Sequence, residues 1–401
     1  MTVATSLLRA LILGILLLPG GTYGAERQAS SEWTPSELRV LRSLWIESLK
    51  PVPPDPSNNV ADDPAAADLG EQLFFDVRLS ANGEVACATC HRPALYFTDG
   101  RPLARGIGET KRGAPSLIGI AYSPWLYWDG RRDSLWSQAL VPLETPVEHG
   151  LDRHRVLDVI SADGSLAESY EALFGSLPDR TADDQSINRA FSNVGKAIAA
   201  YERSLVPKPA RFDAYVASLL DVSKQGSDQD QSILSPDEIE GLRLFISDRA
   251  QCLRCHNSPL FTNFGFHNIG LIEGKRGVRE YDFGRADGVS EAIDDPFRCD
   301  GPYSDAGPDD CIEERFVLKR SKELVAAFKV PTLRNVAATA PYMHDGRFAT
   351  LRDVLQHYKE APKFRMGFQQ LLPLDLTPRE IQQLISFIDT LTGPPPDAPK
   401  S

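Results

Sequence analysis

Two copies of the pattern Cys-x-x-Cys-His constrain the fold of this 401-residue chain more than any other feature. They consist of Cys87, Cys90 and His91 in the first half and of Cys252, Cys255 and His256 in the second. The two thiols of such a motif can add to the vinyl groups of a haem, and the adjacent imidazole can bind its iron. Paired Cys-x-x-Cys units also bind zinc or form disulfides, but neither use requires the His in both copies. The spacing predicts two covalently bound haem c groups.

The first residues are typical of an export signal. Arg9 precedes an apolar run over residues 11–18, and small residues follow near Gly24. The run is shorter than the roughly 20 apolar residues that a membrane-spanning helix needs. We therefore expect a signal peptide over residues 1–24, export to the periplasm and no membrane span in the mature protein. A retained N-terminal anchor is the alternative.

Cys299 and Cys311 are the cysteines outside the motifs, and they enclose a loop rich in Gly, Pro and Asp. In an oxidising compartment two such cysteines are expected to pair. A disulfide between them would stabilise the folded chain by roughly 2–4 kcal/mol.

Helix signals dominate the sequence, whereas strand signals are scarce. Three segments, 34–37, 235–238 and 377–380, combine a Ser or Thr N-cap with Pro at the first helical position and Glu at the third, which is a capping box. Long connections rich in Gly, Pro and Asp, such as 97–115 and 268–308, need an organising element, and a bound cofactor would supply it. We expect a mainly α fold, in which two cytochrome c-like haem domains carry long loops.

A polar segment rich in Gln, Asp and Ser lies at 223–232, between the two motifs. Its composition is that of a linker. We therefore expect an N-terminal cytochrome c-like domain over residues 25–222 and a C-terminal one over 233–401.

The net charge of the chain is −12 at pH 7, and no run of Lys or Arg is longer than two. Nucleic acids and anionic lipid surfaces attract clustered positive charge. We therefore expect no nucleic-acid partner.

Several landmarks, taken with the two motifs, resemble the bacterial di-haem cytochrome c peroxidase superfamily and, within it, the MauG-like enzymes. They are residues 73–76 (Leu-Phe-Phe-Asp), 128–131 (Trp-Asp-Gly-Arg), 330–335 (Val-Pro-Thr-Leu-Arg-Asn) and 340–346 (Ala-Pro-Tyr-Met-His-Asp-Gly). The resemblance extends from about residue 63 to 392. It implies an oxidoreductase that uses hydrogen peroxide, with a peroxide-reactive haem in the N-terminal domain and an electron-transfer haem in the C-terminal one.

The resemblance also implies the second ligand of the C-terminal haem. In the peroxidases of this superfamily a Met binds that iron, and in MauG a Tyr does. The matching residue is Tyr358, which shares one helical face with Leu351, Val354 and Leu355. His357 is rotated by about 100° from that face and is expected to be solvent-facing or a surface hydrogen bonder. A core aromatic without a ligand role is the alternative for Tyr358.

The N-terminal haem is expected to be five-coordinate, because no His occurs between His91 and His149 to match the distal His of the peroxidases. The family's distal pocket matches Gln138, Pro142 and Glu148. Glu148 would move protons between the peroxide oxygens, work that suits a carboxyl with a raised pKa. Gln138 would hydrogen bond the bound oxygen species, and Pro142 would restrict the space. A solvated surface role is the alternative for Glu148.

Trp128 matches the family's electron relay between the two haems. Trp125, Tyr127 and Trp136 lie near it in the sequence, but an aromatic cluster is more often simply core. The family also binds one calcium ion, for which Thr339 and Pro341 match the carbonyl donors. Gly113 or Ala114 stands where the family has an Asn ligand, which puts the calcium in question.

Three functions remain open at this point. The pattern looks most like MbnH-type proteins, and it consists of the Tyr ligand, the missing distal His, residues 33–35 and 51–55, and the Cys299–Cys311 loop. This resemblance implies oxidation of a Trp to kynurenine on a secreted, MbnP-like copper-binding partner. The second reading is a peroxidase that takes electrons from a small cytochrome or copper protein. The third is a non-catalytic electron carrier, which would need two closed irons.

Overall fold

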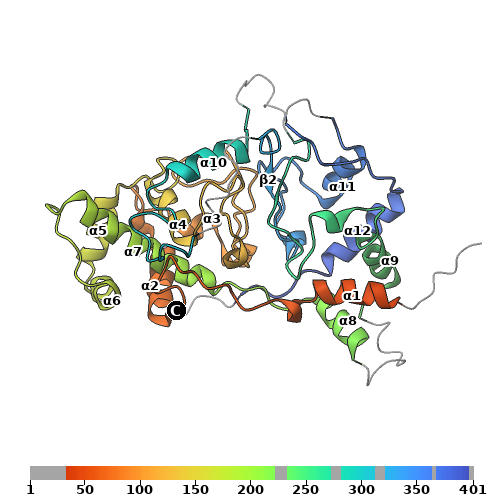
Figure 1. Cartoon of the computed structure of the whole chain (residues 1–401), viewed down its shortest axis with the longest axis horizontal. Helices are drawn as coiled ribbons and strands as arrows, with labels where there is room; N and C mark the ends of the chain where they lie inside the picture. The colour runs from red at the N-terminus through yellow and green to blue at the C-terminus, as the bar shows by residue number, and fades with distance from the viewer. Residues whose placement is uncertain (1–32, 222–232, 272–280, 312–320, 364–366, 397–401) are drawn as a thin grey trace, which may run out of the picture.

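The computed structural model describes residues 33–221, 233–271, 281–311, 321–363 and 367–396, and Figure 1 shows their arrangement. The expected signal peptide and linker lie outside these residues. The fold is mainly helical, as the sequence predicted. Its strands β1 (Phe266–His267) and β2 (Phe328–Lys329) form one short antiparallel pair, in which Phe266 is opposite Lys329.

The helices gather in two groups (Figure 1). The first group contains α2 (Pro64–Phe75), α3 (Cys87–Cys90), α4 (Leu135–Glu144), α5 (Arg153–Ala162), α6 (Gly164–Phe174), α7 (Asp184–Arg203) and α10 (Arg285–Asp294). The second contains α1 (Pro35–Leu44), α8 (Arg211–Leu220), α9 (Pro236–Phe245), α11 (Leu351–Glu360) and α12 (Pro378–Asp389). Short 3-10 turns connect them at η1 (Ile46–Ser48), η2 (Val77–Leu79), η3 (Pro93–Leu95), η4 (Ile120–Tyr122), η6 (Cys252–Arg254) and η8 (Val336–Ala338).

The three expected capping boxes are confirmed. Thr34, Ser235 and Thr377 each accept a hydrogen bond from the backbone N–H of the Glu three residues later, and that Glu side chain accepts one in return. Each box satisfies amide groups that the first helical turn leaves without partners, so the local sequence defines where α1, α9 and α12 begin.

Helices α2 and α7 cross closely at Gly70. A methyl group on Gly70 would lie 1.9 Å from the carbonyl oxygen of Ala197, so only Gly permits the contact. This crossing places the long helix α7, which is buried from Ala190 to Arg203, behind the first Cys motif. It thereby fixes one wall of the N-terminal site.

The two hydrophobic cores do not follow the expected domain boundaries. Helices α1 and α8, which belong to the first half of the sequence, pack in the core of the second group with α9 and α12. Arg334 and Asp213 form a buried ion pair of 2.8 Å that holds α8 there. Conversely, Phe297 and Tyr303 pack in the first core. The segment 223–232 thus separates the two motifs but not the two cores, and the domain division at that point stays a prediction.

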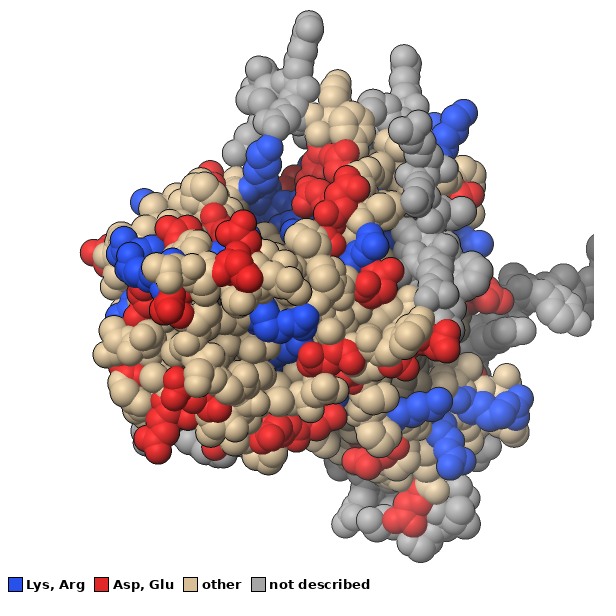
Figure 2. Space-filling view, turned by 60° about the vertical axis from the view of Figure 1, so that its left-hand side comes forward, with Lys and Arg blue, Asp and Glu red and all other residues tan. Residues whose placement is uncertain are grey.

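Cys299 and Cys311 are joined by a disulfide, the pairing that the sequence analysis expected. Lys196 and Asp305 form an ion pair of 2.7 Å between α7 and this loop. In the described part of the chain, every helix is too short or too polar to cross a membrane. Figure 2 shows Asp and Glu spread among smaller groups of Lys and Arg over the face it presents.

Candidate haem sites and the cleft between them

The first Cys motif forms the short helix α3, and His91 follows at its C-terminal end. The thiols of Cys87 and Cys90 are not joined to each other. The Nδ1–H group of His91 donates to the carbonyl of Phe97 at 3.0 Å. Because this bond fixes the ring and its tautomer, Nε2 remains available as a ligand.

The second motif repeats this arrangement. The Nδ1–H group of His256 donates to the carbonyl of Phe261 at 2.9 Å, and the thiols of Cys252 and Cys255 are likewise not joined. Phe97 and Phe261 both have left-handed backbone, with φ of 59° and 53°. Such a conformation is unfavourable for a bulky residue and is retained where the surrounding structure demands it. Both halves therefore use the same local geometry to orient the His.

A cavity of about 450 Å³ adjoins the first motif, and it brings together the residues that the sequence analysis selected. Its lining includes Gln138 and Pro142 from α4 and Glu148 from the following turn. Burial raises the pKa of Glu148, and nearby Arg131 opposes this rise. The Oε1 atom of Gln138 is buried and has no hydrogen-bond partner. A buried acceptor without a partner is costly, so this atom suits a ligand bound in the cavity.

Two further lining residues were missed by the sequence analysis. Glu202 on α7 is 4% exposed, its Oε2 atom has no hydrogen-bond partner, and burial raises its pKa to about 8. His149 is buried, and its Nδ1–H donates to the carbonyl of Leu79 at 2.7 Å. A signal for Glu202 was present, because it continues the apolar face of Val194 and Ile198 at four-residue spacing.

Tyr358 lies on the inward face of α11 and packs against the second core. Burial raises the pKa of its phenol, and the thiols of Cys255 and Cys252 are close enough to raise it further. Tyr358 and Cys252 thus pack against the same core, and the ligand role of Tyr358 stays a prediction. The expectation that His357 faces solvent was wrong, because this side chain is buried. Its Nε2–H donates to the carbonyl of Ile269 at 2.7 Å, so the chain around Ile269 covers the His357 side of α11.

Trp128 lies at a cleft of about 1020 Å³ that residues of both halves line. Its indole N–H donates to the carbonyl of Gly113 at 2.9 Å, and its own carbonyl accepts from the backbone N–H of Lys329 at 2.8 Å. Thr339 and Pro341, the expected calcium ligands, line the same cleft. Trp128 is thus in contact with both halves of the chain.

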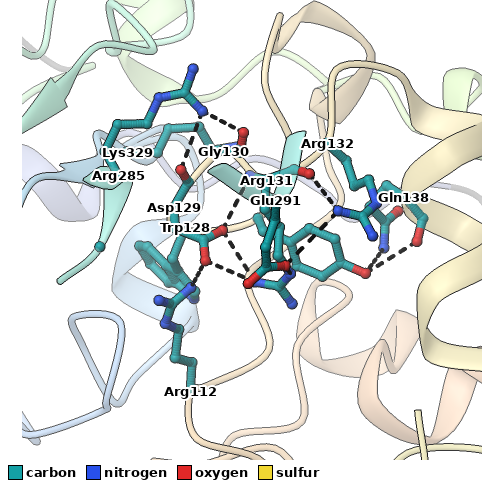
Figure 3. Close-up of polar contacts among 12 residues, drawn as sticks. Arg112, Trp128, Asp129, Gly130, Arg131, Arg132, Gln138, Arg285, Glu291 and Lys329 are labelled. Atoms are coloured by element: carbon teal, nitrogen blue, oxygen red, sulfur yellow. Dashed lines mark hydrogen bonds and ion pairs between the residues drawn. The ribbon is translucent and has the colours of Figure 1, made fainter. Parts of the chain in front are cut away.

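A charged network surrounds the backbone next to Trp128, as Figure 3 shows. The buried carboxylate of Asp129 pairs with Arg112 at 2.6 Å and with Arg131 at 3.1 Å. From the other side, buried Arg285 donates to the carbonyls of Asp129 and Gly130. The Lys329 side chain donates to the backbone carbonyl of Trp125, and burial lowers the pKa of this amine to about 7. This network connects the loop to α10 through Arg285 and to β2 through Lys329.

Comparison with known proteins gives the chain a family. A family model described as di-haem cytochrome c peroxidase matches residues 64–219. The methylamine utilization protein MauG of Methylorubrum extorquens is 30% identical over 393 residues, which cover 96% of this chain and 95% of that protein. A cytochrome-c peroxidase of Denitromonas iodatirespirans is 32% identical over 363 residues, covering 88% of this chain and 89% of that protein. This chain belongs to the MauG and di-haem cytochrome c peroxidase family.

Solved structures of MauG-like proteins share the fold. A MauG-like protein associated with microbial copper homeostasis is 26% identical, with a TM-score of 0.63 and coverage of 86% of this chain and 94% of that one. The diheme peroxidase BthA of Burkholderia thailandensis is 25% identical, with a TM-score of 0.62 and coverage of 82% and 86%. The predicted fold of two cytochrome c-like domains is confirmed by this similarity of fold. The family membership makes the chain an oxidoreductase of the di-haem peroxidase type.

The residues present fit the two haems of this family. Among the described residues no three His, Cys, Asp or Glu side chains gather closely enough to hold a metal ion. Each motif instead has an oriented His, two unjoined thiols and a neighbouring set of buried side chains. The calcium site stays a prediction that depends on carbonyl oxygens and water, because Gly113 offers no side-chain ligand.

Proposed function

We propose that this protein uses hydrogen peroxide to oxidise aromatic residues, above all Trp, of a partner protein by long-range electron transfer. The observation that carries the proposal is that Tyr358, on α11, packs against the same core as Cys252 of the second motif. His256 and Tyr358 would hold the C-terminal haem as its two protein ligands. A centre closed in this way can hold an oxidising equivalent but cannot bind peroxide.

The N-terminal cavity is the proposed peroxide site. A haem attached through Cys87 and Cys90 and ligated by His91 would supply the redox chemistry there. Glu148 would take a proton from one peroxide oxygen and deliver it to the other, and the raised pKa that burial gives this carboxyl suits the transfer. The free Oε1 of Gln138 would accept a hydrogen bond from the protonated oxygen. Pro142 would limit the space above the ligand.

Trp128 is the proposed electron relay between the two halves. It lines the cleft, and its hydrogen bonds to Gly113 and Lys329 fix it to both sides. One peroxide takes up two electrons and two protons and gives two waters. The two electrons would come from an indole ring of the partner. This ring gains one oxygen atom from water, and two protons are released. A bulky partner therefore need not enter the peroxide pocket.

The proposed partner is a secreted protein, for which an MbnP-like copper-binding protein is the first candidate. The similar solved protein is MauG-like and associated with microbial copper homeostasis, which supports this choice. We also propose covalent haem attachment and export to the periplasm, from the motifs and the first 24 residues. A peroxidase supplied with electrons by a small cytochrome or copper protein is the second candidate, because several relatives are named cytochrome-c peroxidases.

Mass spectrometry of the partner after treatment with peroxide and the haem-loaded protein tests the proposal. We expect added oxygen on a partner Trp, and we expect Trp128→Phe to slow this oxidation strongly. Trp45→Phe is a matched control, because Trp45 is also partly buried but packs in the second core. Rapid peroxide turnover with a reduced small cytochrome, without any change in the partner, would establish the second candidate instead.

A further inference from the structure

The aromatic residues next to Trp128 differ from it in what covers their rings. The guanidinium carbon of Arg285 lies 4.1 Å from the centre of the Trp125 ring. That of Arg131 lies 3.5 Å from the centre of the Tyr127 ring. Among the described residues, no Arg or Lys is recorded over the ring of Trp128. Three oxidisable side chains within four positions of the sequence thus have different electrostatic surroundings.

A cation over the face of an aromatic ring interacts favourably with the π electrons. Removing one electron from the ring turns this attraction into a repulsion between two positive charges, so the covered ring is harder to oxidise. The effect is strong where the cation cannot move away. Arg285 is 4% exposed and is held by the carbonyls of Asp129 and Gly130.

The Lys329 side chain donates to the carbonyl of Trp125 at 2.9 Å, and it adds part of a positive charge near neutral pH, because burial lowers its pKa to about 7. Tyr127 has a different second obstacle. Its phenol donates to the carbonyl of Gln138 at 3.1 Å, and an amide carbonyl cannot take up the proton that an oxidised phenol releases. Burial raises the pKa of this phenol as well.

Trp128 has neither obstacle. Its indole N–H donates to the neutral carbonyl of Gly113, which stabilises positive charge on the ring. The carboxylate of Asp129, the next residue, is buried and pairs with Arg112 and Arg131. An indole can also lose an electron and keep its proton. Of the three side chains, Trp128 is therefore the one from which an electron leaves most easily.

We infer that Arg285 and Arg131 confine electron loss to Trp128 by making Trp125 and Tyr127 hard to oxidise. The two Arg residues are positioning residues, because they act through the neighbouring rings and neither lines the peroxide pocket, although Arg131 is close enough to lower the pKa of Glu148. The inference rests on the proposed relay role of Trp128. It adds that the surrounding cations select the route, so that oxidising equivalents do not damage the rest of the loop.

The location of added oxygen within one peptide tests the inference. Without an electron donor, one peroxide takes two electrons and two protons from an aromatic side chain and a water molecule. The products are a hydroxylated side chain and water, so atoms and electrons balance. Trypsin cleaves after Arg112 and Arg131, which releases peptide 113–131 with Trp125, Tyr127 and Trp128 together. Tandem mass spectrometry of this peptide then shows which residue carries the oxygen.

In the haem-loaded wild-type protein we expect oxygen on Trp128 and little on Trp125 or Tyr127. Arg285→Gln should raise the share on Trp125 by roughly tenfold, the size of one cation–π interaction. Arg285→Lys should keep the wild-type pattern, because the charge remains. Arg131→Gln, from which trypsin releases peptide 113–132 instead, should raise the share on Tyr127 less, because the phenol proton still lacks an acceptor.

Arg189→Gln is a matched control, because its guanidinium lies 5.6 Å from the centre of the Tyr303 ring, away from the cleft. Trp128→Phe removes the proposed relay and leaves Arg285 and Arg131 in place. Because Arg285 still covers the Trp125 ring, the added oxygen should not move to Trp125. Equal oxidation of Trp125 and Trp128 in the wild type, or an unchanged pattern in folded, haem-loaded Arg285→Gln, would overturn the inference. A wild-type pattern as expected, together with an unmodified partner protein, would refute the proposed function alone.

Discussion

Replacement of Gly106 by Ala tests whether the position of Glu148 controls the reaction with peroxide. A methyl group on Gly106 would lie 2.6 Å from the carbonyl oxygen of Glu148 and 2.8 Å from its Cα atom. To reach the 3.4 Å of ordinary contact, the Glu148 backbone must retreat by roughly 0.8 Å. The N–H group of neighbouring Ile107 donates to the same carbonyl at 3.0 Å, so the two segments cannot separate freely.

A displacement of about 1 Å in a catalytic group can cost roughly a hundredfold in rate. We therefore expect Gly106→Ala to slow the reaction of the loaded protein with peroxide by roughly ten- to a hundredfold, measured by stopped-flow absorbance. Glu148→Gln shows how much the rate falls when the proton transfer is lost, because this variant removes the carboxyl and leaves the backbone in place. Gly164→Ala is the control, because no atom lies near the added methyl group there. A folded Gly106→Ala protein that reacts at the wild-type rate would refute the role of Glu148.

Three further predictions concern other parts of the molecule. Tyr358→Phe removes the proposed ligand oxygen and should convert the low-spin haem signal in electron paramagnetic resonance to high-spin. If His149→Phe changed the low-spin signal and Tyr358→Phe did not, His149 would be a second ligand of the N-terminal haem iron. Burial raises the pKa of Glu202 from 4.5 to about 8, so its contribution to stability is complete below pH 4.5 and is lost as the pH rises to about 8. Glu202→Gln should therefore flatten the decline in urea-unfolding stability between these values, and a parallel decline would refute the assignment. Gly70→Ala should lower the free energy of unfolding by ~2 kcal/mol through overpacking against Ala197, whereas Gly164→Ala should be close to neutral.

The sequence was sufficient where chemistry is local. The capping boxes at Thr34, Ser235 and Thr377 need only four residues each, and the haem motifs need five. The helical face of Tyr358 also followed from short-range periodicity. The selection of Gln138, Pro142 and Glu148 depended on the family resemblance, because nothing in their spacing shows that they meet His91 across one cavity.

Tertiary packing explains what the sequence did not reveal. His357 appeared solvent-facing because its helix alone does not show that residues near Ile269 cover it. Glu202 continues an apolar face, but only the crossing of α2 and α7 turns that face toward the first motif. Similarly, the capping box at Thr34 showed where α1 begins, and it did not show which core this helix joins.

The exchange of segments between the two cores has a consequence for how this protein can be dissected. A fragment ending near residue 222 would retain α8 without α9 and α12, and would leave the apolar side chains of Phe212 and Val216 exposed to water. The complementary fragment would lack the Asp213 partner of buried Arg334, and an unpaired buried charge is strongly destabilising. We therefore expect neither single-haem half to be soluble when it is expressed alone. Co-expression of the two halves should instead yield a stable complex of the two fragments, in which each fragment completes the hydrophobic core of the other.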